Sequence, residues 1–298
     1  MLRRVFWALG VTVLLAAPVA VLAQGDYLDV YIVKAKPEKV AEFNAIAKKI
    51  VEANRRHNGD RWLASETMYG EGDTFVFTSV RQNYADIDKA SEAFMSALHK
   101  AYGKDAAEKI LHDWGNCLAT SRNELRRRRF DLSRKAPTDA AAYAQLIGGS
   151  RVLRTIAVRV RPGHVADFEA FLKEAKAAGE KVENTQPLLV SQAVEGTKGT
   201  TFYISTLRSS LAGFDNNPTI REILGEEGYK KYLQVNAESV ESTESALYRF
   251  SPELSNPPEE FVAAAPDFWN PKPAVALAGA RTKPKAPAIK ETTEKRKQ

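Results

Sequence analysis

The sequence predicts an α+β fold in which one unit of strands and helices occurs twice in tandem. Three stretches of the first half recur in the second half in the same order, at offsets between 122 and 127 residues. The matched pairs are residues 30–37 with 155–162, residues 72–80 with 199–207, and residues 125–133 with 247–255. Self-similarity of this kind indicates a duplicated structural unit.

Hydrophobic periodicity predicts a β-α-β-β-α-β order in the first copy. A β-branched run ends at Pro37, a residue that suits the first turn of a helix, and the glycines at positions 70 and 72 favour a hairpin turn. The predicted elements are, in order, strand 28–35, helix 38–56, strands 61–69 and 74–80, helices 87–102 and 106–121, and strand 125–132.

The second copy repeats this order. Pro218 interrupts a helical region that leads into the last helix, and a short helix is expected at 140–147, in the link between the copies. The predicted elements of the second copy are strand 153–161, helix 163–182, strands 188–194 and 201–207, helix 226–240, and strand 246–251.

The chain therefore divides into five parts. Because the composition turns to Pro, Ala and Lys near the end, we expect disorder from about residue 272. The aromatic residues Phe261, Phe268 and Trp269 predict that the stretch before it packs on the folded body. The parts are a signal peptide (1–23), a first repeat (24–133), a linker (134–150), a second repeat (151–255) and a C-terminal extension (256–298).

The N-terminus predicts export. Arg3 and Arg4 precede an apolar run that ends in Val21-Leu22-Ala23, as in a secretory signal peptide cleaved after Ala23. An uncleaved anchor and a twin-arginine signal are the alternatives. A periplasmic or secreted location follows, and Cys117, the single cysteine, excludes an internal disulfide and suits a small buried residue.

The positive charge lies at the two ends. Of the formal net charge of +6, Arg3 and Arg4 supply two charges, and residues 272–298 supply eight Lys and Arg against Glu291 and Glu294. The folded part is close to neutral, which argues against a nucleic-acid partner. The basic tail is either a solvated extension or a weak contact with an anionic envelope surface.

The order of elements in two copies resembles that of the dimeric α+β barrel superfamily, which is built on ferredoxin-like units. This group includes the antibiotic-biosynthesis monooxygenase-like and the NIPSNAP-like domains. In such proteins two units lay their sheets together into a barrel. The resemblance covers residues 27–255. It implies a tandem duplication that forms a pseudo-dimeric α+β barrel within one chain, and hence a monomer.

No catalytic residue transfers from the family. Haem-degrading and quinone-forming members use an Asn, a Trp and a His, and these three do not map onto this chain. The four histidines, His57, His99, His112 and His164, fall in predicted helices or at their ends, without metal-ligand spacing. Nucleotide-binding and nucleophile-elbow motifs are also missing from the sequence, so we predict no metal and no cofactor.

The run Arg126-Arg127-Arg128-Arg129 is the most unusual feature of the sequence. On a strand, two of the four side chains point one way and two the other. The run is either an exposed sheet edge whose charges deter aggregation, or a pair, taken as Arg127 and Arg129, that points into the barrel. An inward pair needs a counter-charge, from Glu66 or from an anionic ligand.

Strand alternation also predicts which residues face the barrel. Matching of the two copies places Phe75, Phe77, Phe202 and Ile204 toward the helices and Val76, Thr78, Tyr203 and Ser205 inward. These inward side chains either line a cavity or fill the space between the sheets. The candidate ligand-binding residues are Trp62, Glu66, Arg127, Arg129, Arg159, Tyr203 and Ser205.

The leading hypothesis is an exported, non-enzymatic protein that binds a small, anionic or aromatic molecule between its repeats. The first alternative is a cofactor-independent oxidoreductase of the monooxygenase-like group. The second is a structural or interaction protein of the cell envelope. The absence of a recognisable catalytic set favours binding, although the sequence leaves the question of enzymatic activity open.

Overall fold

The computed structural model describes residues 26–270. The predicted signal peptide and the predicted disordered tail lie outside these residues. None of the helices between residues 26 and 270 is both long and apolar enough to cross a membrane.

The first repeat follows the predicted order of elements. A turn of 3₁₀ helix at Pro37–Lys39 leads into the first helix, as the position of Pro37 predicts. The elements are β1 (Tyr27–Ala35), α1 (Val40–Arg56), β2 (Leu63–Tyr69), β3 (Thr74–Arg81), α2 (Ala85–Tyr102), α3 (Lys104–Asn116) and β4 (Leu118–Arg128).

The second repeat has the same order after a short linking helix, and two further helices follow it. A capping box at Thr219 and Glu222 fixes the start of its long helix. The elements are α4 (Ala140–Gly148), β5 (Val152–Val160), α5 (Val165–Glu180), β6 (Leu189–Glu195), β7 (Thr200–Arg208), α6 (Ile220–Ser239), β8 (Val240–Phe250), α7 (Glu259–Ala264) and α8 (Pro266–Trp269).

The strands form one closed antiparallel barrel in the order β1-β3-β2-β8-β5-β7-β6-β4. Within each repeat, the first strand pairs with the third and the fourth, so the two halves have equivalent pairings. Between the repeats, β2 pairs with β8 and β4 pairs with β6. The chain therefore forms a dimeric α+β barrel from two ferredoxin-like halves, as the sequence predicts.

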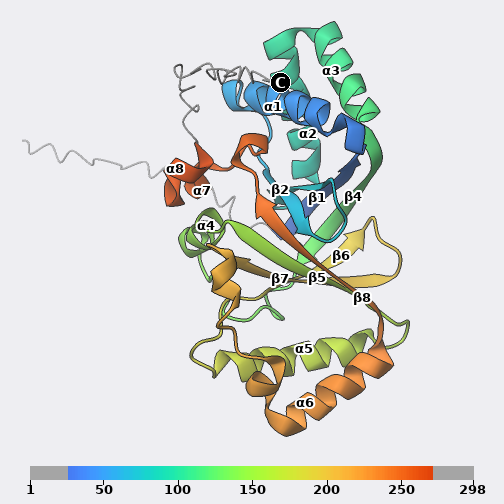
Figure 1. The fold of residues 1–298 in the computed structure, drawn as a ribbon, viewed down its shortest axis with the longest axis vertical. Helices are drawn as coiled ribbons and strands as arrows, with labels where there is room; N and C mark the ends of the chain where they lie inside the picture. Colours follow the sequence, from blue (N-terminus) through green and yellow to red (C-terminus); the bar gives the residue numbers. More distant parts are fainter. Residues whose placement is uncertain (1–25, 271–298) are drawn as a thin grey trace, which may run out of the picture.

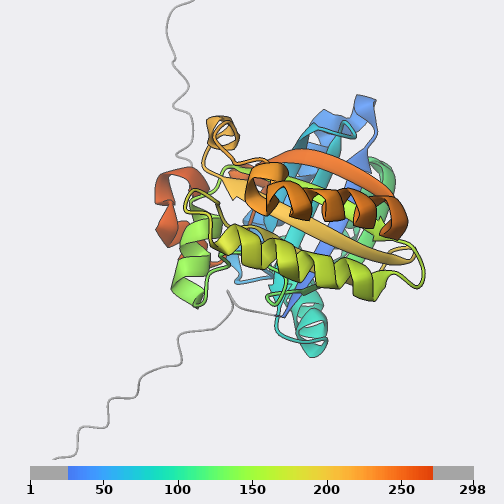
Figure 2. The same cartoon turned by 90° about the horizontal axis from the view of Figure 1, so that it is seen from below.

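Helices cover the barrel on two opposite sides (Figure 1). The helices α1, α2 and α3 pack on the outer face of the first repeat around Phe43, Phe75 and Trp114, and α5 and α6 cover the second repeat around Phe168 and Phe202. At one end of the barrel, α4 and α7 lie against each other, and Figure 2 shows this helical group beside the strands.

The alternation of side chains agrees with the sequence. Phe75, Phe77, Phe202 and Ile204 pack in the layers between sheet and helices. In contrast, Val76, Thr78, Tyr203 and Ser205 line the interior of the barrel. Phe261 and Trp269 are buried, so the stretch after β8 packs on the body as predicted.

Three predicted boundaries are wrong for a common reason. Helix α3 ends at Asn116, five residues before the predicted end at Ser121, and β4 already begins at Leu118. Similarly, β8 begins at Val240, where the sequence predicts a helix. The first halves of both strands are exposed and polar, so they lack the apolar alternation by which strands are recognised.

The arginine run does not form an exposed sheet edge. Its strand, β4, pairs with β1 on one side and with β6 on the other. Closure of the barrel leaves this strand without a free edge, because a strand of the second repeat pairs with its open side. The edge interpretation is therefore wrong, and two of the arginines have to face the interior.

Candidate ligand site inside the barrel

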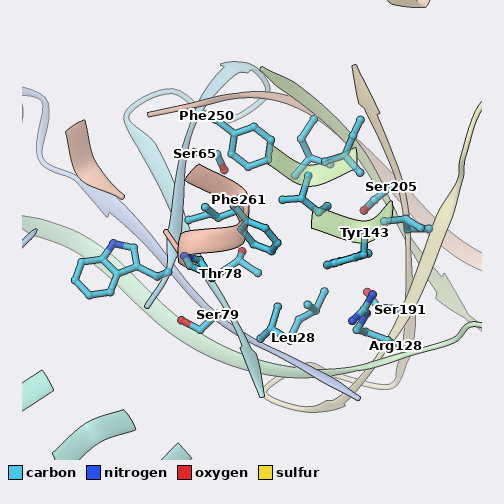
Figure 3. Close-up of a pocket in the computed structure, with 18 of the residues that line it drawn as sticks. Leu28, Ser65, Thr78, Ser79, Arg128, Tyr143, Ser191, Ser205, Phe250 and Phe261 are labelled. Carbon is cyan, nitrogen blue, oxygen red and sulfur yellow. The ribbon is translucent and has the colours of Figure 1, made fainter. Parts of the chain in front are cut away.

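The barrel interior holds an apolar cavity near the helical end, a charged cluster at the centre, and a polar opening at the other end. The cavity has a volume of about 110 Å³ and lies between the two repeats (Figure 3). We call it the barrel cavity. Its apolar wall comes from strands of both repeats and consists of Leu28, Leu63, Val80, Leu153, Leu189, Leu207 and Phe250.

Helices close the barrel cavity at its end. Tyr143 and Ile147 project from α4, and Phe261 projects from α7. The indole N–H of Trp269 donates a hydrogen bond of 2.9 Å to the carbonyl of Gly148, which ties α8 to α4. A Cβ on Gly148 would lie 2.5 Å from the carbonyl oxygen of Phe261, so glycine is required for this close approach.

Arg128 is the buried charge in the wall of the barrel cavity. Its side chain is 9% exposed, and its guanidinium carbon lies 4.1 Å from the ring centre of Tyr143 and 4.5 Å from that of Phe130. Figure 3 shows Arg128 beside Ser191, its register partner on β6, with the ring of Tyr143 next to it. Burial lowers the pKa of Arg128.

Hydroxyl groups supply the other polar atoms of the wall. Ser65, Thr78, Ser191 and Ser205 face the cavity, and the Ser205 hydroxyl forms a hydrogen bond of 3.1 Å with that of Thr155. Such a wall, mostly apolar with a few fixed polar groups, is typical of small-molecule sites.

The charged cluster at the centre is built on Glu124, whose side chain is 2% exposed. Arg126 donates hydrogen bonds of 2.8 and 2.6 Å to its Oε2 atom, Arg122 donates one of 2.9 Å to Oε1, and the Tyr203 hydroxyl donates one of 2.7 Å to Oε2. Burial raises the pKa of Glu124, but Arg126, Tyr203 and Arg122 together hold it below its usual value. Burial raises the pKa of Tyr203.

The polar opening lies beyond this cluster. It has a volume of about 420 Å³ and is lined by Arg122, Arg159, Lys198 and Glu244, among others. Arg159 Nη1 lies 3.8 Å from a carboxylate oxygen of Glu241, and its buried Nε has no partner among the described residues. A smaller space of about 120 Å³, lined by residues of both ends, lies between the opening and the barrel cavity.

A larger cleft of about 720 Å³ lies outside the barrel, between its sheet and the helices of the first repeat. We call it the helix–sheet cleft. Its polar side holds Arg81, which binds Asp60 through two hydrogen bonds of 2.8 Å and Asp29 through longer ones. Its aromatic side consists of Tyr31, Trp62, Phe77, Phe94 and Trp114.

Of the predicted site residues, three face the barrel interior. Ser205 lines the barrel cavity, Tyr203 belongs to the central cluster and Arg159 to the polar opening. They lie at different depths along the barrel, so the structure does not gather them into a single pocket.

The other four predicted site residues lie elsewhere. Trp62 packs under the helices, where its indole donates a hydrogen bond of 2.8 Å to the Leu254 carbonyl. It borders both the barrel cavity and the helix–sheet cleft. Glu66 is exposed on the outer face of β2, so it cannot be the counter-charge inside the barrel. Arg127 is exposed, and Arg129 binds Asp131 and Glu169 on the outside.

The choice of arginines was therefore wrong by one residue. Arg126 and Arg128 point inward, and the counter-charge of Arg126 is Glu124 on the same strand. Leu125 pairs with Asp29 on the helix-covered face of β1, which fixes the even-numbered arginines on the inner face. Treating Leu125 as a helix-facing residue would have identified both arginines from the sequence.

Comparisons with known proteins find similarity in fold only. No protein-family model matches the chain, and no curated protein matches its sequence. Solved structures do match. One is an anthrone oxidase-like protein with a TM-score of 0.49 and 13% identity, over 77% of this chain and 93% of that one.

Two more matches come from named bacteria. Chlorite dismutase from Candidatus Nitrospira defluvii matches with a TM-score of 0.44 and 11% identity, over 81% of this chain and 96% of that one. A heme-binding protein from Thermus thermophilus matches with a TM-score of 0.42 and 10% identity, over 78% of this chain and 94% of that one.

Within residues 26–270, no group of three or more His, Cys, Asp or Glu residues could hold a metal ion.

Proposed function

We propose that this protein binds a small, predominantly apolar molecule in the barrel cavity between its two repeats. The observation that supports the proposal is a largely apolar cavity whose wall comes from both repeats. An engineered protein cavity of about 150 Å³ with a similar lining stays dry and binds benzene. With a volume of about 110 Å³, the barrel cavity suits a single ring or a short branched chain.

The free-energy cost of leaving a core space unfilled sets what a ligand can gain by filling it. Cavity volume in a protein core destabilises the fold by about 24 cal/mol per Å³. For a cavity of about 110 Å³ this corresponds to roughly 2–3 kcal/mol. A ligand that fills the space would return part of this free energy through its apolar contacts.

The ionisable groups of the central cluster favour binding over catalysis. A general acid or base works best with a pKa near the ambient pH. The pKa of Glu124 is lowered and that of Tyr203 is raised, so both move away from neutrality. Neither group would exchange a proton readily at neutral pH.

The test is thermal unfolding of the protein with toluene as probe. Toluene should raise the melting temperature of the wild type, because it binds only the folded state. The variant Thr78→Ile should abolish this shift, since it replaces the hydroxyl that faces the cavity by a bulkier ethyl group. The same substitution at Thr243, an exposed residue on β8, is the control and should leave the shift unchanged. A wild type that toluene does not stabilise would refute the proposal.

A second candidate function is the binding of a larger aromatic molecule in the helix–sheet cleft. Its volume of about 720 Å³ is typical of small-molecule sites, which span about 300–1,000 Å³. Quenching of tryptophan fluorescence by a soluble quinone tests this idea, because Trp62 and Trp114 line the cleft. Quenching that saturates and that weakens in Trp114→Phe would support it, and linear, purely collisional quenching would refute it.

Export and oligomeric state form part of the same proposal. We propose that the protein acts outside the cytoplasm as a monomer, because its N-terminus has the features of a signal peptide and its own two repeats close the barrel. A mature N-terminus at Gln24 and a molar mass of one chain in light scattering are expected. A chain that retains Met1 would contradict export with cleavage, and a mass of two chains would contradict the monomeric state.

A further inference from the structure

We infer that the polar opening of the barrel binds a phosphate group through Arg159, Lys198 and Arg122. This inference goes beyond the proposed function, because the opening and the barrel cavity share no lining residue. Three observations support it: a buried donor without a partner, an excess of positive charge, and a volume that suits a small ligand.

The Nε–H group of Arg159 is the donor without a partner. The atom is buried and forms no hydrogen bond within residues 26–270. Three other buried polar atoms of these residues also lack a partner, but they belong to residues that line none of the cavities described above, His99, Arg134 and Glu260. Because an unpaired buried N–H costs free energy, a ligand atom at Arg159 would stabilise the protein.

The strand register places Arg159 among groups that can share an anion with it. Arg159 lies opposite Thr201 on β7 and Ser242 on β8, and all three line the opening. Thr201 is buried, and its hydroxyl forms no hydrogen bond within the described part of the chain. The Nη1 atom of Arg159 lies 3.8 Å from Glu241, and a pair this long and exposed binds weakly.

The charge around the opening is positive. The cations that line it are Arg122, Arg159 and Lys198, and the acids are Glu124 and Glu244. The carboxylate of Glu124 is already balanced in the central cluster by a guanidinium outside the opening. Three cations therefore share the opening with one uncompensated carboxylate, and an anion would reduce the repulsion between them.

The cations also have donors left for a ligand. Lys198, in the hairpin between β6 and β7, forms no hydrogen bond or ion pair with residues 26–270. Arg122 donates its Nε–H to Glu124, and its Nη groups form no other bond within these residues. The three cations come from β4, β5 and the hairpin, so they approach the opening from different sides. This arrangement suits a tetrahedral phosphate better than a planar carboxylate, which a single guanidinium binds in its own plane.

The volume of the opening leaves room for more than a bare ion. A space of about 420 Å³ lies within the range of small-molecule sites, about 300–1,000 Å³. Ser242 and Glu244 in its wall can accept hydrogen bonds from hydroxyl groups of a ligand. The phosphate group can therefore come from inorganic phosphate or from a small phosphomonoester, which glycerol 1-phosphate represents.

The experiment measures the affinity of the full-length protein for inorganic phosphate, glycerol 1-phosphate and acetate by titration calorimetry at neutral pH. Phosphate should bind roughly tenfold or more tightly than acetate, because its larger charge interacts with several cations. Tighter binding of glycerol 1-phosphate than of phosphate would assign the phosphomonoester, and equal or weaker binding would assign the free ion. Phosphate that binds no more tightly than acetate would overturn the inference.

Two variants test the residues. Arg159→Met should weaken phosphate binding roughly tenfold or more, because it removes hydrogen bonds from a charged donor. Lys198→Met should weaken it about three- to fivefold, as expected for an exposed ion pair. Because Lys198 is exposed in a hairpin, this second variant serves if Arg159→Met fails to fold.

Arg154→Met is the matched control. Arg154 lies on the same strand as Arg159, five residues before it, so its side chain points to the other face, where it is exposed. The substitution removes the same charge and should leave the phosphate affinity unchanged. Equal losses in Arg154→Met and Arg159→Met would reveal a general effect of net charge and overturn the site, as would affinity that survives both Arg159→Met and Lys198→Met. None of these results affects the toluene test of the barrel cavity.

Discussion

The hydroxyl of Tyr203, on β7 of the second repeat, donates a hydrogen bond of 2.7 Å to the carboxylate of Glu124, on β4 of the first repeat. The guanidinium of Arg126 binds the same carboxylate and lies 3.5 Å from the ring centre of Tyr203. Both residues point into the barrel. This contact joins the repeats through their side chains, in addition to the backbone pairing of β4 with β6.

We expect Tyr203→Phe to reduce the free energy of unfolding by about 1.5–3 kcal/mol, the range for a hydrogen bond to a charged group. The substitution keeps the ring under Arg126 but removes one donor from a buried carboxylate. Urea unfolding followed by circular dichroism measures the change.

Tyr248→Phe is the control for this substitution. Tyr248 also faces the barrel interior, and its hydroxyl forms no hydrogen bond with the side chains or backbone of residues 26–270. Its replacement should therefore change the stability by less than the replacement of Tyr203. Equal losses in the two variants would show that the bond to Glu124 contributes nothing specific.

The stability should also depend on pH through Glu124. Its pKa in the folded state is lower than in the unfolded chain, where Glu titrates near about 4.3. The unfolded state therefore binds the proton more readily. The stabilisation is fully present above the unfolded pKa and is lost as the pH falls through the folded pKa.

The variant Glu124→Gln tests this pH dependence. Urea unfolding between neutral and acidic pH should show a smaller loss of stability on acidification in the variant than in the wild type. The variant will be less stable at neutral pH, because Arg126 and Arg122 lose their counter-charge. Parallel pH profiles of the two proteins would contradict the assignment.

The sequence predicted the architecture well because two independent patterns agree. Self-similarity identified the two repeats, and alternation correctly separated residues such as Phe75 and Phe202, which face the helices, from Thr78 and Ser205, which face the interior. The family resemblance then predicted the closure of the barrel, but the strand that carries the arginine run was still interpreted as a possible exposed edge, which its pairing with β1 and β6 excludes.

The candidate site was harder to predict, because it depends on partners that are distant in the chain. Arg126 is neutralised by Glu124, two residues away, but only the strand register shows that both face inward. The closure of the cavity by Phe261 and Tyr143 brings together residues 118 positions apart. Periodicity within one element contains no information about such contacts.

The ion cluster of Arg81 provides a further prediction. Arg81 is 8% exposed and binds Asp60 and Asp29 at the edge of the helix–sheet cleft. Arg81→Met should destabilise the protein by about 1.5–3 kcal/mol, the range for hydrogen bonds to charged groups, because it leaves the partly buried carboxylates of Asp60 and Asp29 without this partner. Lys109→Met, which breaks an exposed pair with Asp113, is the control and should cost at most about 0.5 kcal/mol. Similar effects in chemical unfolding would contradict the burial argument.

The hairpin between β6 and β7 contains two glycines that separate backbone strain from steric contact. Gly196 and Gly199 have φ angles of +85° and +69°, so alanine is strained at both. A Cβ on Gly196 would lie 2.0 Å from the carbonyl oxygen of Asn123, whereas one on Gly199 would meet nothing closer than 4.0 Å.

Gly199→Ala should therefore lower the free energy of unfolding by about 1 kcal/mol, the typical strain of a left-handed residue. Gly196→Ala should cost at least about 2 kcal/mol more, because β4 has to move away from the hairpin. Urea unfolding of the two variants measures the difference.

The displacement of β4 should also weaken the central cluster, because Asn123 directly precedes Glu124. The loss of unfolding free energy caused by Tyr203→Phe should therefore be smaller in the Gly196→Ala background than in the wild type. Additive losses would show that the hairpin and the cluster are independent.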